Sequence, residues 1–150
     1  AISGVVYTTR DRAAEPLPAA SRYTVATSGS SAIDPISVEL SAPAALEGVA
    51  LVDGPMGEIA TLAAGRPVEL RWKAGAAGDI VYVTLETDTL STLCAYRDES
   101  GRGTLPASAL TSGSAALSVH RLRATPFSSV GVGSGELRFD FEVSRAVTIE

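Results

Sequence analysis

The chain has 150 residues, of which 45% are hydrophobic and 19% are charged, and this balance excludes an intrinsically disordered chain. A net charge of −5 argues against nucleic acid as a partner, because phosphate binding needs a clustered Lys/Arg surface. The apolar runs are short, as in residues 49–52, whereas a membrane helix needs roughly 20 apolar residues, so no span is predicted. We therefore expect one packed domain over residues 1–150.

Short segments rich in β-branched residues and separated by turn signals predict strands in the first half of the chain. These predicted strands cover residues 2–9, 23–27, 36–40 and 49–52. The proline-bearing segment 13–21 predicts a loop or an edge segment, and residues 44–47 predict one helical turn. Asp53-Gly54-Pro55 predicts a turn after the fourth strand.

The second half shows clearer alternation. In residues 67–73, Val68, Leu70 and Trp72 point to one side while charged residues point to the other, the period of two that a half-buried strand requires. Further strands are predicted over residues 79–86, 93–98, 115–124 and 136–150. Between them we expect a short helical turn that begins at Pro106, a strand end near Pro126 and a flexible loop over residues 131–135.

About eight short strands with turns between them predict an all-β fold. One-sided alternation favours antiparallel pairing, because parallel strands that are buried on both faces form continuous apolar runs. We expect an antiparallel two-sheet sandwich, with an open β-barrel as the alternative.

The last segment contains one violation of its own pattern. Odd-numbered residues from Leu137 to Val143 face the predicted core, and Val147 and Ile149 continue that phase. Arg145 falls on the same side, where an unpaired charge is costly. We therefore expect a bulge, a bend or a sheet edge near residues 144–146, with residues 147–150 as a separate terminal piece.

Three residue types that often carry chemistry occur only once. His120, the only histidine, lies in mid-strand without an orienting partner in any motif, which predicts a surface or interface residue rather than a general base. Cys94 and Trp72 share the alternation phase of their apolar neighbours. We expect both to be buried in one core between two sheets.

The sequence shows no motif for a metal, phosphate or cofactor site. One His and one Cys cannot form a zinc site without carboxylates. Asp98 with Glu99, or Asp53 with Glu58, could bind Ca²⁺ together with backbone carbonyls, but neither pair has the spacing of a calcium loop. The glycine-rich residues 131–135 precede a strand and lack the Lys-Ser/Thr end of a phosphate loop. We therefore predict no catalytic residue, no cofactor and no metal.

The central segments resemble a pattern found in secreted proteins and lipoproteins of myxobacteria and related GC-rich bacteria. The residues that carry the resemblance are Pro67, Leu70, Trp72, Asp79, Val81, Val83, Leu85, Cys94, Asp98, Gly101, Thr104, Pro106 and Leu110. The resemblance implies an immunoglobulin-like sandwich on an extracytoplasmic protein, and it implies no functional residues. The chain departs from antibody-type domains, since it has no second Cys and Tyr96 follows Cys94 rather than preceding it.

These observations lead to an expectation about function. We expect a non-catalytic structural or binding module of an extracytoplasmic bacterial protein, whose partner is a protein or a cell-surface component. The alternatives are a small hydrolase or metal-dependent enzyme that uses His120 with carboxylates, and a glycan- or lipid-binding module. The chain begins at Ala1 rather than Met and carries no signal-type segment, which indicates a fragment or a mature form.

Overall fold

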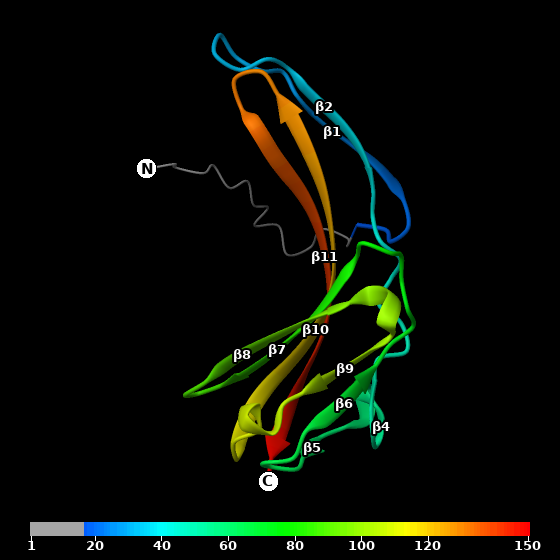
Figure 1. The fold of residues 1–150 in the computed structure, drawn as a ribbon, viewed down its shortest axis with the longest axis vertical. Coiled ribbons are helices and arrows are strands. Elements are labelled where there is room, and N and C mark those ends of the chain that lie inside the picture. The colour runs from blue at the N-terminus through cyan, green and yellow to red at the C-terminus, as the bar shows by residue number, and fades with distance from the viewer. Residues whose placement is uncertain (1–16) are drawn as a thin grey trace.

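The computed structural model describes residues 17–150, and in that range the protein is all-β, without an α-helix (Figure 1). The strands are β1 (Arg22–Thr27), β2 (Ile36–Ser41), β3 (Ala50–Leu51), β4 (Gly54–Pro55), β5 (Thr61–Leu62), β6 (Val68–Arg71), β7 (Ile80–Thr87), β8 (Ser91–Arg97), β9 (Arg102–Leu105), β10 (Gly113–Ser129) and β11 (Gly133–Ile149). Three short 3-10 turns complete the elements: η1 (Met56–Glu58), η2 (Asp98–Ser100) and η3 (Ala107–Ala109).

The strands form three sheets, and none of these sheets closes into a barrel. One sheet has the order β5-β11-β10-β7-β8, a second has the order β4-β3-β6-β9, and β1 pairs with β2 in a separate two-stranded ribbon. Every pairing is antiparallel except the short contact of β5 with β11. The predicted all-β class and antiparallel pairing are confirmed.

The hairpin of β10 and β11 is the longest feature of the molecule. Each strand has 17 residues, and the register runs without a break from Gly113 opposite Ile149 to Ser129 opposite Gly133. In Figure 1 this hairpin extends from the lower body, where β7 and β8 flank it, to the upper end, where β1 and β2 lie beside it. The predicted strand end near Pro126 is wrong. β7 pairs with β10 only as far as Leu122, so one edge of β10 is open at Pro126 and no ladder bond is lost there.

The larger of two hydrophobic cores draws side chains from both multi-stranded sheets. Leu70 and Leu105 come from one sheet, and Val83 and Leu117 come from the other, all of them fully buried. Trp72 is buried in this core, as expected, whereas Cys94 is only partly buried and packs against it. The predicted burial is therefore confirmed for Trp72 and wrong for Cys94, which contacts the same core from its margin.

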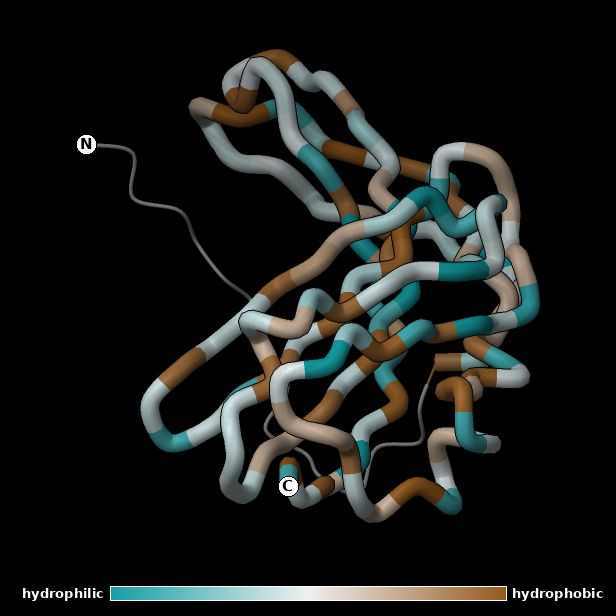
Figure 2. The backbone as a smooth tube through the Cα atoms, turned by 60° about the horizontal axis from the view of Figure 1, so that its bottom comes forward, coloured by the Kyte–Doolittle hydropathy of each residue, from teal (hydrophilic) through white to brown (hydrophobic). Residues whose placement is uncertain are grey.

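The smaller core lies beside the upper half of the long hairpin. Leu40 of β2 and Phe139 of β11 are buried there, and the rings of Tyr23 and Phe139 are 5.2 Å apart. Both cores arise from the same period-two pattern: Figure 2 shows hydrophobic and hydrophilic positions alternating along the strands. The β1–β2 ribbon thus covers apolar side chains of β11 that would otherwise face water.

Arg145, a charged residue in the core-facing phase of β11, lies at a sheet edge and not at a bulge. β11 pairs with β10 in continuous register through this region, and β5 joins its other side only at Thr148 and Ile149. Arg145 is exposed, although it lies opposite the buried Leu117. The expected bulge and separate terminal piece are wrong, and the expected edge is confirmed, because an open edge lets the guanidinium reach water.

Two further predictions concern local structure. Residues 44–47 do not form a helical turn, because the carbonyl oxygens of Ala44 and Ala45 accept hydrogen bonds from Arg121 instead of from the next turn. The turn after Pro106 is confirmed as η3. The strand predicted over residues 2–9 lies outside the described range. Within that range, no helix has the length and apolar character needed to cross a membrane.

Candidate functional site

Two arginines on the inward face of β10 are each paired with a buried aspartate. The Arg121 Nη2 donates to Asp98 Oδ1 at 2.9 Å, and its Nε lies 2.7 Å from Oδ2. Both side chains are almost completely buried, at 1% and 0% exposure. The Nε–Oδ2 contact is an ion pair whose geometry falls outside that of a hydrogen bond. A buried pair of this kind needs further polar partners to offset the lost hydration.

Those partners come from two other segments of the chain. The Trp72 Nε1 donates to Asp98 Oδ1 at 2.9 Å, and Arg121 donates to the carbonyl oxygens of Ala45 and Lys73. Gly75 makes this packing possible, since a Cβ at this position would collide with the Asp98 carboxylate. The network therefore holds the 44–45 and 72–75 segments against β10. In it, the carboxylate of Asp98 has a structural role.

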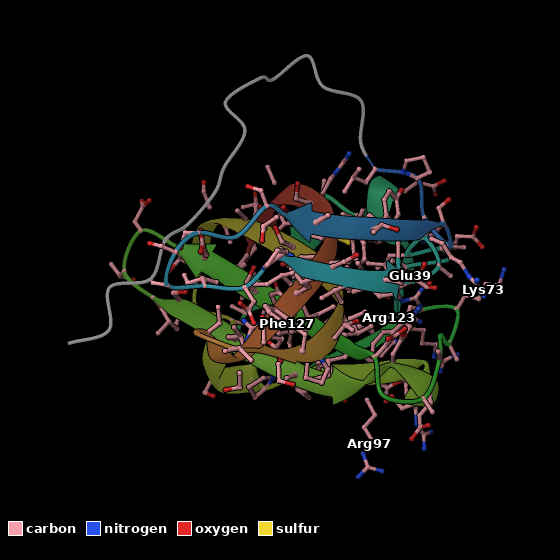
Figure 3. All side chains as sticks on the ribbon, turned by 90° about the horizontal axis from the view of Figure 1, so that it is seen from above. Glu39, Lys73, Arg97, Arg123 and Phe127 are labelled. Atoms are coloured by element: carbon pink, nitrogen blue, oxygen red, sulfur yellow. The ribbon has the colours of Figure 1, made fainter. Side chains whose placement is uncertain are left out.

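The second arginine, Arg123, connects β10 to the start of β7 and to the end of β2. Arg123 binds Asp79 through two contacts of 2.6 Å and also donates to the carbonyl oxygens of Ser41 and Ala42. The hydrogen bond with Asp79 raises the pKa of Arg123, which keeps it charged. In Figure 3, Arg123 lies within the body near the end of β2, whereas Arg97 and Lys73 extend outward. Arg123 thus joins β10 to the ribbon that carries the smaller core.

The solvent-facing side of β7, β10 and β11 carries a different polar group, which we call the His120 cluster: Tyr82, Ser118, His120, Asp140 and Glu142. The rings of Tyr82 and His120 stack with centroids 4.2 Å apart. His120 Nδ1 lies 3.0 Å from Asp140 Oδ1, and the Tyr82 hydroxyl donates to the other carboxylate oxygen. Burial, followed by the nearby Asp140, raises the pKa of Tyr82 well above its ordinary value.

The His120 cluster has part of the geometry of a general-base site. Asp140 orients the imidazole through Nδ1, as a carboxylate does in a catalytic triad. The nearest serine of the cluster is engaged elsewhere, because the Ser118 hydroxyl donates to Glu142 at 2.7 Å. The cluster borders a shallow concavity of about 280 Å³ on an open sheet face. The His120 side chain is 14% exposed on this face, and its partner Asp140 is one that the sequence did not indicate.

The acidic pairs named in the sequence do not converge on a metal site. The Asp98 carboxylate faces Arg121, and Glu99 instead lies 3.9 Å from the exposed Arg97. Asp53 and Glu58 are both exposed. Among residues 17–150, no three His, Cys, Asp or Glu side chains gather in a group that could hold a metal ion.

Sequence reasoning missed both arginine pairs and the partners of His120. One signal was present: Arg121 and Arg123 continue the phase of Leu117 and Val119, so they face inward and require buried acceptors. The identity of those acceptors had no local signal, because Asp98 and Asp79 lie 23 and 44 residues away.

Comparison of the chain with protein-family models, with curated proteins and with solved structures finds no match.

Proposed function

We propose that this protein is a non-catalytic binding module of an extracytoplasmic bacterial protein, built as one immunoglobulin-like sandwich from its two multi-stranded sheets. The proposal rests on one observation: the side chains that could react are engaged in contacts within the protein. Asp98, Arg121 and Trp72 bind one another in the interior, and Cys94 packs against the larger core. Groups held in this way stabilise a scaffold, and the exposed sheet faces remain for contact with a partner.

The partner that suits such a scaffold is a protein or another component of the cell surface. The open face around His120 offers hydroxyls and carboxylates from three adjacent strands in a shallow concavity. A shallow polar face of this kind suits contact with a large partner, whereas a small-molecule site is usually a deeper and mostly apolar cleft.

Binding to isolated cell envelopes tests this proposal. The purified chain is mixed with washed envelopes of a GC-rich bacterium and sedimented, and the bound fraction is measured against the concentration of the chain. We expect saturable binding that Ser118→Arg weakens, because the new side chain covers the concavity, while Ser30→Arg on the exposed β1–β2 connection leaves it unchanged. Equal binding by all three proteins would contradict a specific role for this face.

A small hydrolase that uses His120 is the second candidate, and the contact of His120 with Asp140 favours it. In this function the imidazole would act as a general base toward water or a substrate hydroxyl, with Asp140 as its orienting group. Measurement of substrate turnover distinguishes the two functions, because only the hydrolase requires it.

A further inference from the structure

A second concavity, of about 570 Å³, lies where β6 and β9 run beside the end of β8. Its lining includes Arg71, Arg102, Tyr96 and Gly103. This volume falls within the range of roughly 300–1,000 Å³ that is typical of small-ligand sites. The concavity is separate from the His120 cluster and uses none of its residues.

Two like charges face each other in this concavity. Arg71 and Arg102 are direct cross-strand partners in the β6–β9 ladder, so their side chains leave the sheet on the same face. Like charges that lie directly opposite each other destabilise a sheet. The protein as a whole carries a net charge of −5, so this pair is a local exception to its surface charge.

The protein itself supplies little compensation for this pair. Arg71 lies 3.8 Å from Glu69, but both side chains are largely exposed, and such pairs contribute little. Within residues 17–150, Arg102 forms no ion pair. Arg121 and Arg123, in contrast, each have an aspartate partner. An external anion would give Arg71 and Arg102 the negatively charged partner that an aspartate gives to Arg121 and Arg123.

The backbone around the pair is well defined. The Oγ of Ser100 lies 2.7 Å from the Arg97 carbonyl oxygen and 2.9 Å from that of Arg102, and the Tyr96 hydroxyl donates to the Thr104 carbonyl oxygen at 2.6 Å. The Tyr96 ring lies against Gly103, where a Cβ would come within 2.6 Å of it. These contacts fix the turn before β9 and place the Tyr96 ring on the side of β9 to which Gly103 points, whereas the neighbouring Arg102 projects to the other side.

We propose that this concavity binds an oxyanion, a phosphate or a carboxylate, between Arg71 and Arg102. The planar fork of a guanidinium matches both anions in a bidentate geometry, and two opposed forks can hold one anion from two sides. The anion converts a repulsive pair into two attractive contacts. Glu69 at the rim disfavours anions that are too large to stay clear of its carboxylate.

Calorimetric titration of the whole chain tests the site, with inorganic phosphate, a sugar phosphate and a uronic acid as probes at constant ionic strength. We expect saturable binding of at least one probe, and the strongest probe identifies the source of the anion. Arg71→Ala and Arg102→Ala should each weaken binding by about tenfold or more, since each removes a charge-assisted contact. Arg66→Ala, which removes an exposed arginine outside the concavity, serves as the matched control.

Arg102→Glu gives the sharpest result, because it replaces the repulsive pair with an attractive one. We expect this variant to melt at a temperature equal to or above that of the unliganded wild type, while it no longer binds any probe. Saturable binding that survives in Arg102→Glu, or that falls equally in Arg66→Ala, overturns the proposal, as does the absence of binding to all three probes. These outcomes do not depend on envelope binding through the His120 face, so either proposal can fail alone.

Discussion

Asp98 brings together groups that lie far apart in the sequence. It accepts hydrogen bonds from Trp72 and Arg121, and both its side chain and that of Arg121 are shielded from water. Removal of one partner of a buried pair leaves the other charge without compensation, which typically costs about 3–5 kcal/mol. Asp98 is therefore a structural anchor.

This role gives a direct prediction for stability. We expect Asp98→Ala to lower the free energy of unfolding by about 3–5 kcal/mol, measured by urea denaturation. The double variant Asp98→Ala/Arg121→Met should lose less than the sum of the two single variants, because it removes both charges. Additive losses would show that the two residues stabilise the fold independently.

We expect two tyrosines, Tyr82 and Tyr96, to make the free energy of unfolding fall as the pH rises into the alkaline range. Burial, followed by interaction with Cys94, raises the pKa of Tyr96 to about 12, and burial with Asp140 raises that of Tyr82. The unfolded chain titrates near pH 10, so above that pH it binds fewer protons than the folded chain. The contribution of these groups is therefore complete below about pH 10 and is lost as the pH rises toward 12.

The measurement is the urea midpoint at several pH values between 9 and 12. We expect the midpoint to fall over this interval in the wild type and to fall less steeply in Tyr96→Phe and Tyr82→Phe. The variant Tyr23→Phe serves as a control. An identical slope in the wild type and in the Tyr96 and Tyr82 variants would rule out this origin of the pH dependence.

At the scale of elements, the β10–β11 hairpin belongs to two cores. Its lower half is flanked by β7, whereas its upper half has the β1–β2 ribbon on one face and no third strand in the described structure. The ribbon is held by the Tyr23–Phe139 contact, by Leu40 and by the Arg123 bonds to Ser41 and Ala42. Few contacts hold the ribbon, so it should open more easily than the larger core.

Phe139→Ala tests this arrangement. We expect a loss of about 3 kcal/mol locally, with much faster hydrogen exchange in residues 22–41 and little change in β7 and β8. Phe139→Leu, which keeps an apolar side chain, should show a smaller effect in the same residues. Exchange that rises equally in β7 and β8 would mean that the ribbon and the larger core unfold as one unit.

The strands of the larger core and most of β10 and β11 were predictable, whereas the unbroken length of the hairpin was not, for physical reasons. The alternation around Leu70 and Val83 is local, so a sequence window reveals it. Whether Pro126 ends a strand depends on how far β7 extends, and whether Arg145 needs a bulge depends on where β5 joins. The same applies to the His120 cluster, since Tyr82 and Asp140 lie 58 residues apart. These features depend on which strands are neighbours in the folded protein, and a short sequence window does not contain that information.

At the scale of the whole molecule, the polar groups divide into those that hold the fold and those that face outward. Asp98 and Asp79 bind arginines that join distant segments, so these carboxylates are not available for catalysis. The His120 cluster and the pair of Arg71 and Arg102 remain on open faces. We propose that a protein organised in this way acts through binding at its surface.

The most direct test of that claim is turnover. The purified chain and its His120→Ala variant are assayed with chromogenic esters, phosphoesters and glycosides, with and without added divalent metal ions. We expect no difference between the two proteins for any substrate, because a binding module needs no general base. Multiple turnovers by the wild type that disappear in His120→Ala, while envelope binding is retained, would contradict the account and establish the hydrolase instead.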